Sequence, residues 1–224
     1  MNTIQIAQLC FKQDIQGSEI TLFRGAINKL ISTQGGNELF HNHHADGLRY
    51  AYPLVQYKSI DNHATIIAIG NAIEDLASLS NRQTIQLQIG RRKKDFDVLH
   101  FSVEAYSPEI DDTPKFYTIK RYIPFTNDNY TEYKNLLALT DKIILTEKVL
   151  VGNILSFLKG IGFHIDETIS VAITKIESSY MVNYKGIKFL AFDLSFVTNI
   201  ILPQRIGLGK STSVGFGHIE TTAQ

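Results

Sequence analysis

The sequence is poor in several features that mark whole classes of protein. Its 224 residues include one cysteine and no tryptophan. A single cysteine, Cys10, cannot build a disulfide framework or a multi-cysteine metal site, which predicts a reducing, cytoplasmic setting. No apolar run is long enough to span a bilayer, and the first residues lack the charged segment and apolar core of a signal peptide. These absences argue against a secreted or membrane protein.

The chain also has no excess of charge of either sign. Its 22 basic side chains are matched by 22 acidic ones. Proteins that bind nucleic acids usually carry a basic excess, so this total argues against a polyanionic partner. A neutral chain can still be dipolar. If a nucleic acid binds nonetheless, we expect the basic residues to gather along the face between the two halves of the chain and around residues 207–217, with the acidic residues on the opposite side.

The first ninety residues alternate between strand-like and helix-like patterns. Strands are expected at 3–11, 50–60, 64–69 and 84–89, and Asp61-Asn62 suits a tight hairpin between the second and third. Two sets of apolar residues recur at helical spacing between the strands. They are Leu22, Phe23, Ala26, Ile27, Leu30 and Ile31, and then Ala72, Ile73, Leu76 and Leu79. The order β-α-β-β-α-β predicts a ferredoxin-like unit.

The second half repeats this order incompletely. A charged, proline-bearing stretch at 91–114 resembles a domain boundary. After it we expect a strand at 116–125, a long helix striped by apolar residues at 143–158, and strands at 169–173, 186–197 and 214–219. The second helix is missing. The sequence therefore predicts an α+β fold of two tandem ferredoxin-like units, the second degenerate, covering residues 1–92 and 93–224.

Three of the seven histidines lie within one short segment after the first predicted helix. His41, His43 and His44 could include a general acid and a general base, because imidazole takes and gives protons near neutral pH. They could also form a metal site with Glu38 and Asp46, or simply a solvated loop. No second pair of ligands at metal-like spacing occurs elsewhere, and from the residues alone these three interpretations stay open.

A glycine-rich stretch at 207–217 is the second unusual segment. Gly209-Lys210-Ser211 imitates the end of a P-loop, but Gln204 stands where that motif requires glycine. Glycines still let a backbone approach a ligand closely and expose N–H groups, and Arg205 and Lys210 add positive charge. These properties suit a phosphate backbone. The alternative is an ordinary loop between strands.

These two segments together resemble a known family. The spacing of Gly207-x-Gly209 and Gly215-x-Gly217 is similar to the C-terminal signature of the superfamily once called repeat-associated mysterious proteins. The Phe-His-Asn-His segment at 40–43, followed by Arg-Tyr-Ala-Tyr-Pro at 49–53, is similar to the N-terminal pattern of one subfamily. The chain thus resembles the b-type Cas six endoribonucleases, which process CRISPR precursor RNA.

The resemblance implies metal-independent, cofactor-free cleavage of RNA. A base takes the proton of the 2′-OH, the oxygen attacks the phosphate, and an acid protonates the leaving oxygen. The products are a 2′,3′-cyclic phosphate and a 5′-OH. By motif position, His41 and His43 are the acid and base in either order, and Tyr50 positions the sugar or phosphate. His44 could substitute for either histidine, and Lys58 is a candidate phosphate stabiliser from its proximity alone.

The resemblance also implies how RNA is held and which partners are expected. The glycine-rich stretch would supply the RNA contacts, namely Arg205, Gly207, Gly209, Lys210, Ser211, Gly215 and Gly217. The expected ligand is CRISPR repeat RNA, and a second copy of the chain and a CRISPR effector complex are candidate partners. The alternative is a non-catalytic RNA-binding subunit of such a complex.

Overall fold

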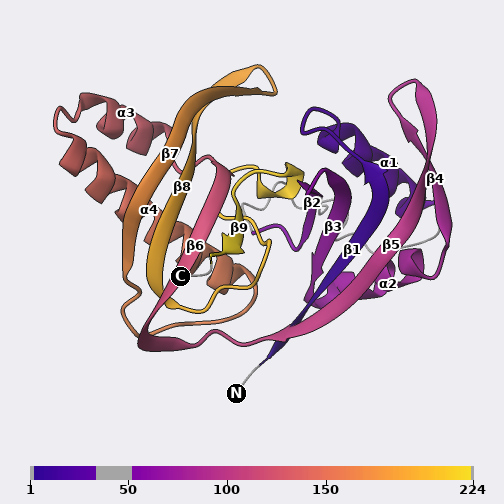
Figure 1. Cartoon of the computed structure of the whole chain (residues 1–224), viewed down its shortest axis with the longest axis horizontal. Coiled ribbons are helices and arrows are strands. Elements are labelled where there is room, and N and C mark those ends of the chain that lie inside the picture. Colours follow the sequence, from indigo (N-terminus) through magenta and orange to yellow (C-terminus); the bar gives the residue numbers. More distant parts are fainter. Residues whose placement is uncertain (1–2, 34–51, 223–224) are drawn as a thin grey trace, which may run out of the picture. The chain divides into compact units, whose positions relative to one another are not determined.

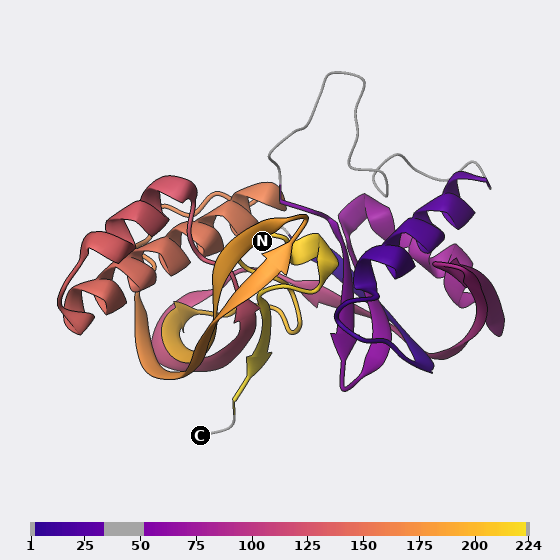
Figure 2. The same cartoon turned by 90° about the horizontal axis from the view of Figure 1, so that it is seen from above.

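The chain folds into two compact units, as described by a computed structural model of residues 3–33 and 52–222 (Figure 1). The first unit comprises Met1–Ser107 together with Ser213–Gly215. The second comprises Pro108–Thr212 together with Phe216–Gln224. Each unit has one antiparallel β-sheet with its helices on one face (Figure 2). This confirms the predicted α+β fold of two ferredoxin-like units.

The first unit contains the predicted order of strands and helices. A short 3-10 turn at Gly70–Ala72 precedes its second helix. Its elements are β1 (Ile4–Asp14), α1 (Ile20–Ser32), β2 (Val55–Ile60), β3 (His63–Ile69), α2 (Ile73–Ser80), β4 (Thr84–Ile89) and β5 (Arg92–Tyr106).

Local sequence explains the first unit's helix and hairpin. Helix α1 buries Ile20, Phe23, Ile27 and Ile31, which recur every three or four residues and so form one face. Phe23 packs edge-on against Phe11 of β1, with ring centroids 5.9 Å apart. The turn between β2 and β3 has φ angles of 50° and 69° at Asp61 and Asn62. The predicted tight hairpin is therefore confirmed.

Strand β5 is the main departure from the predicted order. The sheet runs β2-β3-β1-β5-β4, so β5 pairs with both β1 and β4. The charged residues 91–94 form a turn and the start of a strand, with Gly90 at φ 61°. The predicted domain boundary at 92 and 93 consequently falls inside a hairpin, and the first unit continues to Ser107. Charged residues at the exposed positions of β5 obscure the alternation of apolar and polar residues by which a strand is predicted from sequence.

The second unit has a four-stranded sheet in the order β7-β8-β6-β9. The second helix of a complete ferredoxin-like unit is replaced by the glycine-rich stretch, which contains a 3-10 turn at Thr212–Val214. The elements are β6 (Ile110–Tyr122), α3 (Asn127–Asn135), α4 (Leu139–Gly160), β7 (Val171–Tyr184), β8 (Ile187–Ile200) and β9 (His218–Thr221).

Two helices cover the second sheet, and only one was predicted. Helix α4 buries Leu150, Ile154 and Leu158 of the apolar stripe predicted from the sequence, and it also buries Phe157. Helix α3 has no buried residue and so no apolar period. It begins where the Thr126 hydroxyl accepts a hydrogen bond from the Asn129 N–H at 3.2 Å. No helix within residues 3–33 and 52–222 is long and apolar enough to cross a membrane.

Candidate nucleic-acid interface

The predicted catalytic residues lie between α1 and β2 in the chain. His41, His43, His44 and Tyr50 all fall outside the residues that the structure describes. Their roles therefore stay predictions, based on the resemblance of the motif. Lys58, the fifth member of the predicted site, is described.

Lys58 lies on β2 and is fully buried. Tyr57 points toward α1, where its hydroxyl donates a 2.5 Å hydrogen bond to the Asn28 side chain. Because side chains alternate along a strand, Lys58 points to the sheet face opposite the helices. There it is paired across the strands with Thr65 of β3, which is paired in turn with Cys10 of β1. Within the part of the chain that the structure describes, the Lys58 Nζ has no hydrogen-bond partner.

Burial without a partner changes the acid–base properties of this lysine. Water would stabilise the ammonium form, and its exclusion lowers the pKa of Lys58 from 10.5 to about 7. A lysine with this pKa is partly neutral near physiological pH. It would regain its charge beside an anion such as a phosphate, because an opposite charge favours the ionised form.

The glycine-rich stretch is closely packed, and several of its backbone N–H groups already have partners. The Leu208 N–H donates to the Gly217 carbonyl at 2.8 Å, and the Gly217 N–H donates to the Arg121 carbonyl at 3.1 Å. The Lys210 N–H donates to the Ile123 carbonyl at 2.9 Å. These three N–H groups are engaged within the protein. Among the residues predicted to bind RNA, Gly207, Gly215 and Gly217 are buried, whereas Arg205, Gly209, Lys210 and Ser211 are partly exposed.

At three positions in this stretch the space beside the backbone is too small for any side chain. A Cβ on Gly217 would lie 1.9 Å from the Leu208 carbonyl oxygen, and one on Gly209 would lie 2.6 Å from the Ile123 carbonyl oxygen. A Cβ on Gly207 would lie 2.6 Å from Thr212. Gly217 and Gly209 also have positive φ angles of 64° and 86°. These glycines are therefore required by the conformation of the loop.

We expect Gly217→Ala to destabilise the second unit strongly. The added methyl group must displace the Leu208 backbone at a left-handed φ, which should lower the free energy of unfolding by about 3 kcal/mol or more. Gly25→Ala is the matched control, because Gly25 lies exposed within α1 with no atom near its added Cβ. That change should stabilise by up to about 1 kcal/mol. Urea denaturation of both variants measures the difference, and equal midpoints would contradict this account.

Arg121 is held against the glycine-rich stretch, and no motif in the sequence singled it out. It interrupts the pairing of β6 with β8 and has a φ of 53°, which is unusual for a residue with a side chain. Its N–H donates to the Asp193 carboxylate at 2.7 Å. Asp193 also accepts hydrogen bonds from the hydroxyls of Ser178 and Tyr180, at 2.9 and 3.1 Å. The bulge in β6 is thereby held by Asp193 of the adjacent strand β8, which is itself hydrogen-bonded to β7.

The side chain of Arg121 belongs to a group of cations that each lie over an aromatic ring. Its guanidinium lies 4.4 Å from the centre of Phe216. Lys185 lies 5.6 Å from the centre of Tyr184, and Lys210 lies 5.5 Å from the centre of Phe189. We call these six residues the cation–ring cluster. All belong to the second unit. Such pairs hold cations in place without neutralising them, which suits contact with nucleic acid.

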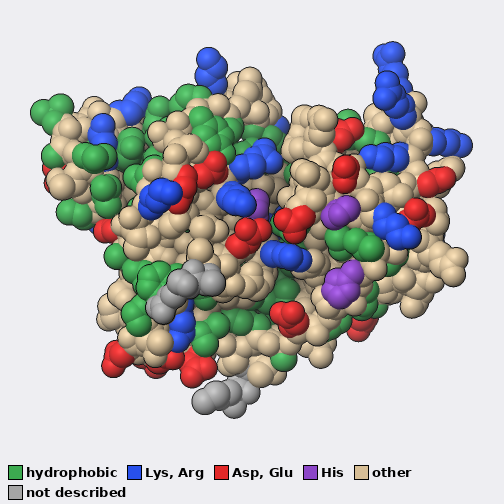
Figure 3. Space-filling model, viewed as in Figure 1, with side chains coloured by type: hydrophobic (Ala, Val, Ile, Leu, Met, Phe, Trp, Pro, Cys, Tyr) green, Lys and Arg blue, Asp and Glu red, His purple; other side chains and the backbone are tan. Residues whose placement is uncertain are grey.

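Metal-ligating side chains do not gather in the described part of the chain. No three histidine, cysteine or carboxylate side chains come together there. Charges of both signs are interspersed on the face shown in Figure 3, so that face has no large patch of one sign. The neutral total of the sequence is therefore matched by a mixed surface on this side. The cation–ring cluster is a local grouping.

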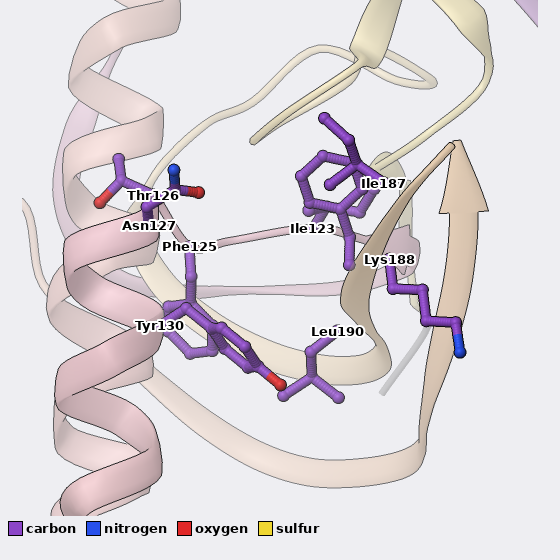
Figure 4. A pocket seen from close by; sticks show the side chains of 9 residues that line it. Ile123, Phe125, Thr126, Asn127, Tyr130, Ile187, Lys188 and Leu190 are labelled. Atoms are coloured by element: carbon purple, nitrogen blue, oxygen red, sulfur yellow. The ribbon is translucent and has the colours of Figure 1, made fainter. Parts of the chain in front are cut away.

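Figure 4 shows a small cavity between the start of α3 and β8. Its volume is about 50 Å³, room for a water molecule or two and too little for a nucleobase. Tyr130 and Leu190 point toward each other across it, whereas Lys188 extends away. A larger, shallow apolar groove of about 500 Å³ lies between α1 and β4. None of the predicted site residues that the structure describes lines either cavity, so we assign neither of them a role in binding RNA.

The fold resembles those of solved structures over nearly the whole chain. One, described as "Crystal structure of Cas6b", has a TM-score of 0.82 and 26% sequence identity, covering 99% of this chain and 100% of the other. Another, "Crystal structure of CRISPR RNA processing endoribonuclease Cas6b", has a TM-score of 0.75 at 22% identity, with the same coverage.

Sequence comparisons assign both halves of the chain to one family. The uncharacterized protein MJ0978 of Methanocaldococcus jannaschii is 37% identical over 105 residues, which is 47% of this chain and 70% of that relative. The model of the Cas6b N-terminal domain matches residues 2–107, and that of the Cas6b C-terminal domain matches residues 109–222. The chain therefore belongs to the Cas6b family, the b-type of the Cas6-type CRISPR RNA processing proteins.

Proposed function

We propose that this protein is a metal-independent endoribonuclease that cuts CRISPR repeat RNA. The match of both Cas6b domain models over residues 2–107 and 109–222 carries the proposal. A similar structure is itself described as a CRISPR RNA processing endoribonuclease. Cleavage proceeds by attack of a 2′-OH on the adjacent phosphate, leaving a 2′,3′-cyclic phosphate and a 5′-OH. The reaction needs a base, an acid and a group that stabilises the crowded phosphate.

Imidazole suits the two proton transfers, so His41 and His43 act as the acid and base, and Tyr50 positions the sugar or phosphate. His44 is a substitute for either histidine. The resemblance of the segment at 40–53 to the b-type pattern supports these roles. Each proton transfer contributes about 100- to 10,000-fold to the rate.

Lys58 stabilises the charge that develops on the phosphate oxygens. Its low pKa and lack of a partner support this role, because a phosphate would restore the charge that burial suppresses. Without RNA the side chain is fully buried. Contact with the phosphate therefore requires the atoms over Lys58 to move aside when RNA binds.

RNA is held by the cation–ring cluster and by the exposed part of the glycine-rich stretch. Lys210 and Ser211 project from that stretch, beside Phe189 in the case of Lys210. Arg205 is partly exposed at its start. The buried glycines Gly207, Gly215 and Gly217 serve this interface by shaping the loop. Cations supply attraction to phosphates, and ring faces supply stacking for unpaired bases.

Cleavage in excess EDTA tests the proposal. The purified chain, incubated with the repeat RNA of its own genome, should release a product that ends in a cyclic phosphate. This end group resists phosphatase until acid opens it. Cleavage that needs a divalent ion would contradict metal independence. If the RNA binds with a steep salt dependence but stays whole, the chain is instead a non-catalytic RNA-binding subunit of a CRISPR effector complex.

A further inference from the structure

Strand β4 forms an edge of the first sheet without the usual protection of an edge strand (Figure 1). Charged residues, proline and bulges normally keep such an edge from pairing with another chain. Residues 84–89, Thr-Ile-Gln-Leu-Gln-Ile, contain no charge and no proline, and they pair with β5 without a register shift. The other edge strands differ, because β2 contains the buried Lys58, β7 has two register shifts, and β9 has four residues. Strand β4 is therefore the edge best suited to pair with a further strand.

The hydrogen bonds between β4 and β5 show which backbone groups of β4 face outward. The Val98 N–H donates to the Gln83 carbonyl at 3.0 Å, one step beyond the last pair of the ladder. Bonded and non-bonded pairs alternate along an antiparallel ladder. The N–H and C=O groups of Thr84, Gln86 and Gln88 consequently point away from β5. Within the part of the chain that the structure describes, these groups have no hydrogen-bond partner.

The apolar groove of about 500 Å³ between α1 and β4 lies beside this edge. Gln86 and Gln88 line it from the strand, and residues at helical spacing, among them Leu22 and Leu30, line it from α1. Leu22 is 48% exposed, and a Cβ added to Gly25 would meet nothing within 4 Å, so the chain leaves this space unfilled. An extended segment added to β4 would place alternate side chains against this face of α1.

Cations lie near both ends of the groove. Arg91 and Arg92 are exposed and follow Gly90, which lines it at the turn between β4 and β5. A Cβ on Gly90 would lie 3.7 Å from Leu22, so this turn is next to the beginning of α1. Lys29, which also lines the groove, is about 10 Å further along the helix. Among the described residues no acidic side chain lines the groove, and these three cations form no ion pair.

We propose that β4 and α1 bind an extended segment of another protein, apolar at alternate positions and with carboxylate side chains at both ends. Its backbone bonds to β4, its apolar side chains fill the groove, and its carboxylates meet the cations. A second copy of this chain fits poorly, because pairing two β4 strands would bring the cations of both copies together. RNA fits poorly because the lining is mainly apolar and phosphates cannot continue a sheet. No residue assigned to RNA binding or cleavage lies in α1 or β4, so the inference is independent of the proposed function.

Hydrogen exchange measured by NMR on the full-length protein tests the pairing without RNA. The probe is a synthetic peptide of alternating valine and threonine with two glutamates at each end. In the free protein the amides of Thr84, Gln86 and Gln88 should exchange fast, and those of Ile85 and Leu87 slowly. Saturating peptide should slow the three outward amides by about tenfold or more. Slow exchange of these three amides in the free protein would mean that the chain covers this edge itself, which would overturn the proposal.

Two variants separate the backbone contribution from the charge contribution. Gln88→Pro removes one outward N–H and leaves the bonds to β5 in place, so it should weaken peptide binding about fivefold or more. Gln88→Thr is its matched control, because it keeps the N–H and should bind within about twofold of the unmodified protein. Lys29→Glu changes an exposed helix position and should weaken binding of this peptide about fivefold. It should leave binding of a peptide with glutamine in place of glutamate unchanged.

Four results would contradict the proposed partner. One is no binding of the glutamate-ended peptide up to about millimolar concentration, and another is tighter binding of a lysine-ended peptide. Protection of the three outward amides that appears on raising the protein concentration alone would mean that a second copy occupies the edge. Displacement of the peptide by a single-stranded RNA oligonucleotide would make the groove an RNA site instead.

Discussion

Replacing Lys58 by methionine is expected to stabilise the protein by as much as about 4 kcal/mol at pH 7. The difference between a pKa of 10.5 in the unfolded chain and about 7 in the folded one sets this upper limit. Methionine has a similar length, fills the same space and carries no charge to desolvate.

The pH dependence identifies the cause of the stabilisation. Lys58 has a lowered pKa when folded, so between about pH 7 and 10.5 the unfolded chain binds more protons than the folded one. The stability of the unmodified protein should therefore rise with pH across this window. The advantage of Lys58→Met should shrink to about 2 kcal/mol near pH 9 and vanish above pH 10.5. Chemical denaturation at several pH values measures it.

Lys93→Met is the control for this experiment, because Lys93 is exposed on β5 and its loss should change stability little at any pH. Cleavage gives an independent measurement. If Lys58 stabilises the phosphate, Lys58→Met should be more stable and yet cut RNA at least about 100-fold more slowly. A stable variant with unchanged cleavage would remove Lys58 from the site. An unchanged stability would contradict its unpartnered burial.

The sequence predicted the elements whose residues alternate or recur at a clear period. Helices α1 and α4 have buried stripes, and the hairpin at Asp61 and Asn62 has the residues that its turn requires. Strand β5 and helix α3 were missed for opposite reasons. Strand β5 pairs with a neighbour on both edges, but charged residues at its exposed positions obscure the apolar–polar alternation that predicts a strand. In α3 no residue is buried, so the helix depends on its cap and has no apolar period.

The candidate site was less predictable, because spacing in the chain does not report what a backbone atom contacts. The glycine-rich stretch was expected to expose N–H groups, yet those of Leu208, Lys210 and Gly217 bond within the protein. Arg121 was one basic residue among many until its strand bulge and the ring of Phe216 were seen. Such positions are fixed by contacts between distant segments, which no local pattern encodes.

Replacing both His41 and His43 by alanine is expected to have the largest effect on cleavage. Each histidine is proposed to transfer one proton, and each transfer is worth about 100- to 10,000-fold. Because both transfers belong to one step, the double variant should lose about 100- to 10,000-fold of the cleavage rate, close to the larger of the two single effects. RNA affinity should change little, because the cation–ring cluster and the glycine-rich stretch lie elsewhere in the sequence.

Single variants and two further controls separate catalysis from folding. His41→Ala and His43→Ala should each slow single-turnover cleavage, and their effects should not simply add, because acid and base act in one step. His164→Ala changes an exposed histidine outside the predicted site and should leave the rate unchanged. Cleavage retained by the double variant but lost on adding His44→Ala would transfer one role to His44. Cleavage retained by the triple variant would contradict histidine acid–base catalysis.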